Sequence, residues 1–268
     1  MTDKPDRDTL DIDALIEQCR SGDTMAQIHA LIALQDADAR RAVDVILLLL
    51  DAEDEGVRDN AVEALGYLGE DRAEQVGPAI EARLADPSIL VRNDAAEALG
   101  LLRYAHARSA LERSLGHDEE WVVRCSAAEA LGYLGDVRAI DALAAALTDE
   151  YEPVRSYAAR AIGLLGDESH ASIIRGRLAV ETEPGLRGVL LAAVARLGDD
   201  TVLGELMTMA EDATGELIAD LHGTVVDLIK HPHHSMIATR VAELARTARN
   251  PHLKKRLAEL VRAGGASE

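Results

Sequence analysis

Apolar residues recur along this chain with the spacing of an α-helix, and the whole pattern occurs five times. Five segments align without gaps and begin 34, 32, 31 and 32 residues apart. They are VRDNAVEALGYLGE (57–70), VRNDAAEALGLLRY (91–104), VRCSAAEALGYLGD (123–136), VRSYAARAIGLLGD (154–167) and LRGVLLAAVARLGD (186–199). Counted from the first Val or Leu as position 0, apolar residues fall at 0, +4, +7, +8 and +11. At about 100° per residue these positions form one broad face of a helix.

A second helical stretch precedes each aligned helix. Residues 137–147 (VRAIDALAAAL) have helical apolar spacing, a turn follows at 148–152, and Pro153 begins the next helix, where its missing N–H is not needed. Gly-Asp or Gly-Glu ends several aligned helices. We expect the glycine in each case to adopt the left-handed conformation that ends a helix, at Gly69, Gly135, Gly166 and Gly198.

Weaker copies of the aligned segment lie at 23–35, 217–230 and 253–265, which gives about eight helix pairs. One pair cannot bury its own apolar face, so the pairs must stack into a superhelix with a concave side. We therefore predict an all-α fold, an α-solenoid without strands. A disordered tail is expected at residues 1–10 and a single solenoid at 11–268, with divergent repeats at 200–268. The predicted core contains Val57, Leu65, Leu68, Val91, Leu99, Val123, Leu131, Leu134, Val154, Ile162 and Leu165.

These residues carry a family resemblance. The pattern V-R-x-x-A-x-x-A-[LI]-G-x-L-G, followed by an acid and by R-A-[VI]-x-x-L as in residues 136–143 (DVRAIDAL), resembles the short HEAT-like repeat of the phycobilisome-lyase type. The resemblance covers roughly residues 11–263. It implies a fold far more specifically than a function, because that family includes bilin lyases, a metal-dependent hydroxylase of a modified lysine, and scaffold proteins. Some of the scaffolds accompany taxis signalling in halophilic archaea.

The charge balance narrows the function classes. There are 48 acidic and 28 basic residues, the net charge is −20, and only four of the basic residues are lysines. Two interpretations are open: adaptation to a very salty cytoplasm, which we favour because the acids are spread along the chain, or an acidic surface that matches a basic partner. No basic patch is present to neutralise phosphates, which argues against a nucleic-acid partner.

Targeting and redox signals are absent from the sequence. The two cysteines, Cys19 and Cys125, form neither a disulfide framework nor a metal motif. The N-terminal residues are acidic and lack a secretory signal, and no apolar run is long enough to cross a membrane. We expect a cytoplasmic protein without membrane contact.

An arginine follows the first apolar residue of every aligned segment, at Arg58, Arg92, Arg124, Arg155 and Arg187. In four units an acid stands six residues earlier: Asp86, Asp118, Asp149 and Glu181. This spacing would let an acid in the turn meet the arginine of the next helix. The functional interpretation is an anion-binding row. We favour the structural one, a ladder of acid–arginine hydrogen bonds that holds the turns and ties the repeats together.

A polar stripe runs opposite the buried face, at positions +2, +6, +9 and +13. If the aligned helices line the concave side, this stripe is its floor, and its glycines at +9 would let a ligand approach the backbone. The predicted partner-binding residues are Asp59, Glu63, Asn93, Glu97, Tyr104, Glu129 and Arg160, with Tyr67, Tyr104 and Tyr133 as sources of apolar contact. The alternative is an ordinary solvated face of an acidic protein.

Two other groups of residues are weaker candidates. His222, His231, His233 and His234 cluster near the weakest repeats, but the chain has no His-Glu dipeptide like those expected of the metal-dependent hydroxylases. We expect a polar loop there, and no metal or other cofactor. Trp121 would be a binding residue if it were exposed. We expect it to be tucked over the core instead, because the apolar Ile89 holds the same position in its repeat. Cys125 is interpreted as a small filler rather than a reactive thiol.

The leading hypothesis is a non-enzymatic scaffold or adaptor. Its concave acidic face would bind a basic or mixed segment of a partner protein, and the family resemblance points to signalling or taxis. A bilin or tetrapyrrole lyase or chaperone is the first alternative, and a metal-dependent hydroxylase is the second. No phosphate-binding loop and no nucleophile motif is present.

Removing salt should destabilise the fold. The screening distance lengthens from about 3 Å at 1 M salt to about 30 Å at 0.01 M, which exposes the repulsion within a chain of net charge −20. Thermal melts followed by circular dichroism should move to lower temperature as salt is withdrawn. A melting temperature that stays constant from molar salt to dilute buffer would contradict the adaptation to high salt.

Overall fold

The computed structural model describes residues 11–214 and, beyond them, 223–224, 228, 243, 246, 248–251, 253–255 and 258. Every regular element in this described part is helical and none is a strand, so the predicted all-α class is confirmed. The expected tail at 1–10 and the histidines of the HPHH region lie outside the described residues. The chain divides into two compact units, Met1–Ala139 and Ile140–Glu268, and each is described by itself. The single solenoid over 11–268 stays a prediction.

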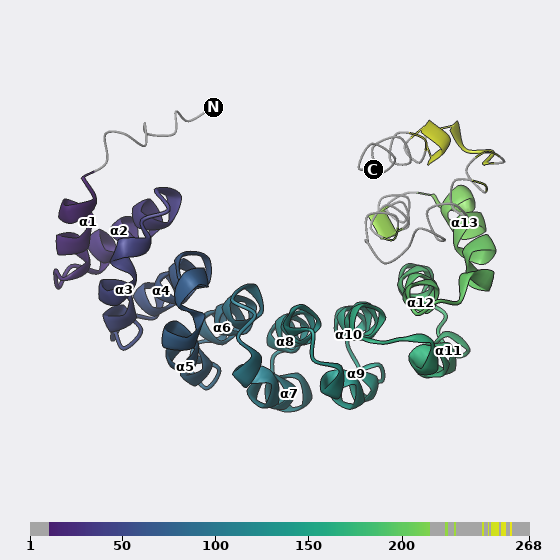
Figure 1. Ribbon diagram of the computed structural model, residues 1–268, viewed down its shortest axis with the longest axis horizontal. Helices are drawn as coiled ribbons and strands as arrows, with labels where there is room; N and C mark the ends of the chain where they lie inside the picture. The colour runs from purple at the N-terminus through teal and green to yellow at the C-terminus, as the bar shows by residue number, and fades with distance from the viewer. Residues whose placement is uncertain are drawn as a thin grey trace. The chain divides into compact units, whose positions relative to one another are not determined.

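The first unit is a row of antiparallel helix pairs (Figure 1). Its helices are α1 (Ile12–Cys19), α2 (Thr24–Asp36), α3 (Val43–Leu49), α4 (Glu55–Leu68), α5 (Ala73–Arg83), α6 (Ile89–Leu101), α7 (Arg108–His117) and α8 (Trp121–Leu134). Short 3₁₀ turns at Arg40–Ala42, Glu70–Arg72, Ala105–Ala107 and Val137–Ala139 follow the second helices of the pairs. Helices α2, α4, α6 and α8 pack side by side as an inner layer, and α1, α3, α5 and α7 form the outer layer.

The second unit repeats this pairing. It contains α9 (Ile140–Ala146), α10 (Glu152–Leu165), α11 (Ala171–Leu178), α12 (Pro184–Arg196) and α13 (Leu203–Asp212), with 3₁₀ turns at Glu168–His170 and Asp200–Val202. Helix α10 packs against α9 and α12, and α12 also packs against α11 and α13. Pro153 and Pro184 stand in the first turns of α10 and α12, as their positions in the repeat predicted.

The predicted core is largely confirmed. Nine of the eleven predicted residues are buried to 2% exposure or less, and Leu134 and Leu165 are only partly covered at the last residues of α8 and α10. Alanine fills much of the remaining interior, at position +7 of every aligned helix and at position +4 of all but the last, where Leu190 stands. Small side chains at these positions let neighbouring helices approach closely.

The helix-ending glycines act in two different ways. Gly135 and Gly198 have φ of 76° and 103°, the left-handed conformation that was predicted. Gly69 and Gly166 have negative φ, so the same prediction is wrong for them. At these two positions glycine is needed because there is no room for a side chain. A Cβ on Gly69 would lie 2.6 Å from the carbonyl oxygen of Leu65, and one on Gly166 would lie 2.7 Å from Leu197.

The arginine row is a structural ladder, but its carboxylate partners differ from those predicted. Each arginine from Arg92 to Arg187 donates to the backbone carbonyl of the acid six residues earlier, at 2.9 to 3.0 Å. The carboxylates of Asp86 and Asp118 point to the preceding repeat instead. Arg58 donates two hydrogen bonds of 2.8 Å to Asp86, and Arg92 donates two of 2.8 and 3.0 Å to Asp118.

The pairing shifts by one repeat because each carboxylate also shapes its own turn. Asp86 accepts from the backbone N–H of Ser88, and Asp118 accepts from that of Glu120. This turn aims the carboxylate backward along the row. Burial disfavours the charged form of Asp86, but hydrogen bonds from Arg58 and Ser88 outweigh it and hold the pKa below its ordinary value. The same balance lowers the pKa of Glu181 to about 2, through hydrogen bonds from Arg177 and from the backbone.

Loss of one ladder arginine should be costly. Arg58→Leu leaves the Asp86 carboxylate, whose side chain is 4% exposed, without its cation, and breaking such a pair costs about 3 kcal/mol or more. Urea unfolding at neutral pH should show this loss. The loss should shrink as the pH falls from the unfolded-state pKa of Asp86 toward its lower folded-state pKa, because the wild-type stabilisation requires the ionised carboxylate.

Two further variants test the cause. Arg138→Leu removes an arginine whose side chain is 72% exposed, and it should cost much less. Arg58→Leu combined with Asp86→Asn should recover part of the stability, because no charge is then left buried. Equal losses for Arg58→Leu and Arg138→Leu would contradict a stabilising role of the ladder.

Candidate functional site

Three glutamates form a row along the inner layer of the first unit. Glu63, Glu97 and Glu129 stand at position +6 of α4, α6 and α8, and we call them the acidic row. Glu63 and Glu97 are exposed and Glu129 is partly exposed. Gln35 donates to Glu63 at 3.2 Å, Asn93 and Ser126 donate to Glu97 at 3.1 and 3.2 Å, and the Tyr133 hydroxyl donates to Glu129 at 3.3 Å. Neutral donors therefore hold the three carboxylates in place.

The acidic row lacks the positive partners that other acids of this unit have. Asp71 pairs with Arg40, Asp44 with Arg72, Asp51 with Arg83, Glu112 with Arg108, and Asp136 with Arg138. Among the residues that the structure describes, no ion pair involves Glu63, Glu97 or Glu129. The arginines of these pairs are engaged away from the three glutamates, so this surface keeps its negative charge.

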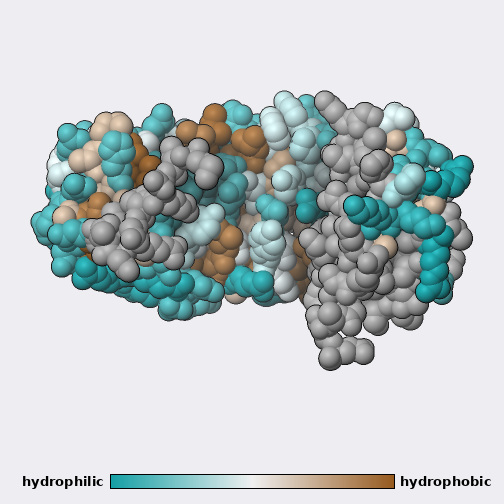
Figure 2. All heavy atoms as spheres, turned by 90° about the horizontal axis from the view of Figure 1, so that it is seen from above, coloured by the Kyte–Doolittle hydropathy of each residue, from teal (hydrophilic) through white to brown (hydrophobic). Residues whose placement is uncertain are grey.

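A second row lies one helical turn further along the same helices. Tyr67, Leu101 and Tyr133 occupy position +10 of α4, α6 and α8, and we call them the apolar row. Their exposed fractions are 52%, 47% and 43%, which is high for large side chains. Figure 2 looks onto this side of the unit and shows hydrophobic patches among hydrophilic residues. Position +10 is Tyr or Leu in four of the five aligned segments and Arg196 in the fifth, so the sequence carries part of this signal, but only Tyr67 and Tyr133 of this row were predicted to supply apolar contact.

The two rows enclose a pair of neighbouring pockets. The first has a volume of about 260 Å³ and is lined by Glu63, Tyr67, Asp94, Glu97, Ala98 and Leu101. The second, of about 150 Å³, is lined by Tyr67, Glu97, Leu101, Ser126, Glu129, Ala130 and Tyr133. Because the pockets share Tyr67, Glu97 and Leu101, they form one groove across α4, α6 and α8. Neither lining contains a basic residue.

Two parts of the predicted stripe are wrong. Tyr104 is only 6% exposed, because α6 ends at Leu101 and Arg103 turns the chain with φ of 49°. Position +13 therefore leaves the helix, and the Tyr104 ring packs on Gly77 of the outer helix α5. The glycines at +9 also face a neighbour instead of a ligand. A Cβ on Gly66 would lie 2.9 Å from the Cβ of Ala98, and one on Gly100 would lie 2.8 Å from the Cα of Ala130.

Asp59 and Asn93 lie beside the acidic row, partly buried at position +2 of α4 and α6. Asn93 donates to Asp94 and to Glu97, both at 3.1 Å, and accepts from the Ser126 hydroxyl at 2.8 Å. The corresponding residue of α8, Cys125, is buried and forms no disulfide, as expected of a filler.

The carboxyl groups of Asp59 and Asp94 lie close enough across the contact between α4 and α6 for a shared proton to join them. Burial raises the pKa of Asp94 to about 7, and the charges of Asp59 and Glu97 add to the effect. Burial also raises the pKa of Asp59, beside Glu63 and Glu55. Asp59 Oδ1 is buried without an N–H donor in the described part of the chain, so the pair is satisfied when one carboxyl keeps its proton.

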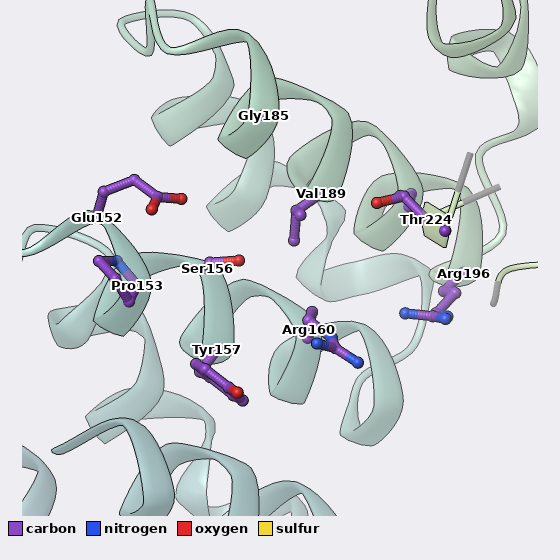
Figure 3. A pocket seen from close by; sticks show the side chains of 11 residues that line it. Glu152, Pro153, Ser156, Tyr157, Arg160, Gly185, Val189, Arg196 and Thr224 are labelled. Carbon is purple, nitrogen blue, oxygen red and sulfur yellow. The ribbon is translucent and has the colours of Figure 1, made fainter. Parts of the chain in front are cut away.

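Arg160 belongs to the second unit, at position +6 of α10. It lines a cavity of about 470 Å³ between α10 and α12, and its guanidinium carbon lies 5.7 Å from the centre of the Tyr157 ring. Figure 3 shows Arg160 and Arg196 pointing toward the same end of this cavity, with Glu152 at the opposite end. The cavity thus differs in charge from the groove of the first unit.

Trp121 is more exposed than predicted. It was expected to be tucked over the core, but its side chain is 37% exposed, and Ile89 at the same position of its repeat is 40% exposed. This position is two residues before position 0, so it lies about 200° around the helix from the core. Within the described residues, no group of three or more His, Cys, Asp or Glu side chains could hold a metal ion. No helix in that part is long and apolar enough to cross a membrane.

The chain belongs to the HEAT-repeat family, whose pattern matches residues 12–76 and 77–156. Several solved structures share its fold. The CpcE–CpcF complex of phycocyanin lyase from Nostoc sp. PCC7120 is 21% identical, with a TM-score of 0.60 over 98% of this chain and 97% of that one. The Escherichia coli protein YIBA is 18% identical, with a TM-score of 0.58 over 96% and 93%. An engineered protein is 20% identical, with a TM-score of 0.55 over 70% and 97%. No curated protein matches the chain.

Replacing Asp94 should make stability less sensitive to pH. In the wild type the folded state keeps a proton that the unfolded chain releases above the ordinary value of 3.8, so stability falls as the pH rises from about 4 to about 7. In Asp94→Asn, the side-chain amide can donate a hydrogen bond to Asp59 at any pH, so no carboxyl has to keep a proton. Its melting temperature should exceed that of the wild type at about pH 8, and the difference should vanish near pH 4.

Asp141→Asn is the matched control, because it removes one exposed acid from α9. It corrects for the general benefit of lowering the negative charge. If Asp94→Asn gained no more stability than Asp141→Asn at about pH 8, the shared proton would be disproved.

Proposed function

We propose that this protein is a non-catalytic scaffold that binds a partner protein in the groove between the acidic row and the apolar row. The observation that carries the proposal is one surface with two kinds of side chain. It has three carboxylates, two exposed and one partly exposed, that form no ion pair with the described residues, and three large exposed apolar side chains. A monomer gains no stability from such an arrangement, whereas a partner with the complementary pattern would bury both rows. The partner is expected to be a segment that carries both basic and apolar residues.

The family supports the proposal in general terms. HEAT repeats build extended surfaces from stacked helices, and such surfaces are suited to binding other chains. The CpcE–CpcF structure is itself a complex of two proteins, although its likeness to this chain extends to the fold alone. A role in signalling or taxis is a further part of the proposal, and it rests on the resemblance described above. The cytoplasmic location stays a prediction of the sequence.

The apolar row must supply much of the affinity. Exposed ion pairs contribute about 1 kcal/mol or less each, and concentrated salt screens them further. Aromatic side chains such as Tyr67 and Tyr133 provide large contact areas and are frequent at binding hot spots. The acidic row would then select among partners and set their orientation more than it would hold them.

Charge reversal tests the proposal. A displayed peptide library selected on the wild-type protein should yield binders rich in Arg or Lys together with apolar residues. Glu63→Lys, Glu97→Lys and Glu129→Lys combined should weaken these binders at least tenfold in a titration calorimeter, because attraction becomes repulsion. Circular dichroism should show the helical fold intact.

The control variant combines Asp51→Lys, Glu53→Lys and Glu74→Lys, all exposed acids outside the groove. Each of the six substitutions replaces −1 by +1, so both triple variants move the net charge from −20 to −14. The control should bind like the wild type. If the two triple variants lost affinity equally, only the overall charge would matter and the groove would not be the binding site.

A lyase-type function is the competing hypothesis, because the fold is shared with a phycocyanin lyase complex. Mixing the protein with a free bilin distinguishes the two. A shifted and intensified absorption band would favour pigment handling, and an unchanged spectrum would favour the scaffold.

A further inference from the structure

The spacing of the groove restricts the shape of the partner. The two pockets repeat along the row because each lies at the contact of two inner helices, α4 with α6 and α6 with α8. Packed helices are about 8 to 10 Å apart, and the glycine–alanine contacts at Gly66 and Gly100 favour the short end of that range. An occupant must therefore present equivalent side chains at intervals of about 8 to 10 Å.

An α-helix meets this requirement better than an extended chain. Residues i and i+7 of a helix lie on one face about 10 Å apart. In an extended segment, same-face residues are about 6.7 Å apart, and the residues about 10 Å apart point to opposite sides. An extended chain with one side chain in the first pocket would thus have no side chain on the same face at the distance of the second pocket.

The distance between the two rows also favours a helix over an extended chain. The acidic and apolar rows are four residues apart on each inner helix, or about 6 Å along its axis. A single extended chain presents one line of side chains to a surface. A helix presents two lines: residues i and i+7, and residues i+4 and i+11, which are turned by about 40° around its axis.

We propose that the groove binds an amphipathic helix of a partner protein with a seven-residue repeat. This inference rests on the proposed function and specifies its partner. Two apolar anchors seven residues apart occupy the pockets, one between Tyr67 and Leu101 and one between Leu101 and Tyr133. Arginines or lysines at i+4 and i+11 meet the acidic row. The small residues at the base of the pockets, Ala98 and Ala130, let the anchors sit close to the inner helices.

The charge of the groove supports this occupant over a purely apolar helix. Glu63, Asp94, Glu97 and Glu129 line the two pockets, and their linings contain no Lys or Arg. An apolar helix would cover these carboxylates without offering them donors, and unpaired buried charge strongly opposes binding. A helix with a basic flank supplies donors to the same carboxylates.

Designed peptides test the geometry. The heptad peptide is an alanine-rich helix with leucines at i and i+7 and arginines at i+4 and i+11. The shifted peptide has the same composition, with its leucines five residues apart. A third peptide carries proline midway between the leucines, which breaks the helix. Fluorescence anisotropy of labelled peptides should show the heptad peptide binding at least tenfold more tightly than either of the others.

Variants of the protein locate the binding. Leu101 borders both pockets, so Leu101→Ala should weaken the heptad peptide about tenfold. Leu48→Ala is the control, because Leu48 is a 71% exposed leucine on the outer helix α3. It should leave the affinity unchanged.

The outcomes separate this inference from the proposed function. Equal binding of the heptad and shifted peptides, or tighter binding of the proline peptide, would overturn the helical partner but leave the groove as a binding site. The same holds if library binders need the acidic row and the heptad peptide does not bind. If library binders are insensitive to the acidic row, the proposed function fails as well.

Discussion

The close contact between neighbouring inner helices is the constraint on which the rest of the first unit depends. Glycine at +9 of one helix meets alanine at +7 of the next, at Gly66 with Ala98 and at Gly100 with Ala130. There is no space for a Cβ at these glycines without displacing the neighbour. The contact fixes the distance from one repeat to the next and commits +7 and +9 to packing. Positions +6 and +10 remain on either side of the contact line, and they become the acidic row and the apolar row.

Electrostatics divides the unit into a paired and an unpaired part. The ladder arginines hold backbone carbonyls of their own turn and, at Arg58 and Arg92, a carboxylate of the next repeat, so repetition itself produces the cross-link. Partly exposed arginines such as Arg40 and Arg72 pair with acids beyond the groove. The result is a chain with many ion pairs whose inner surface nevertheless keeps its negative charge. A high-salt environment would make that charge tolerable, while leaving contact-range hydrogen bonds available to a partner.

The Asp59–Asp94 pair lies directly below this surface and joins α4 to α6. Two carboxyl groups at one helix contact would repel each other if both were ionised, and the raised pKa of Asp94 avoids that state near neutral pH. Asn93 links the pair to Glu97, and Ser126 extends the network to α8. The ionisation of the buried pair and the charge of the groove are therefore coupled through a few hydrogen bonds. Such coupling is a physical reason for polar residues at a helix contact that alanine could fill.

The sequence by itself determined the repeat, the all-helical class and most of the core. Periodicity is a local property, and one buried residue at each of positions 0, +4 and +8 is enough to phase a helix against its neighbours. The same index identified Glu63, Glu97 and Glu129 as surface positions and the arginines as a ladder. These conclusions needed only the geometry of a single helix and the knowledge that the helices stack.

Only the tertiary structure decided which neighbour each side chain meets. Asp86 and Asp118 pair with the arginine of the preceding repeat because their turns aim them backward, and no spacing within one repeat could indicate this. Tyr104 turned inward because α6 ends early, so an index that assumes a continuing helix placed it on the wrong surface. Leu101 borders the proposed binding groove, whereas the glycines that were expected to line it are used for helix contact. These differences have the same cause. The neighbours of a residue at the edge of a helix depend on how close the next helix lies, and the periodicity of a single helix carries no information about that distance.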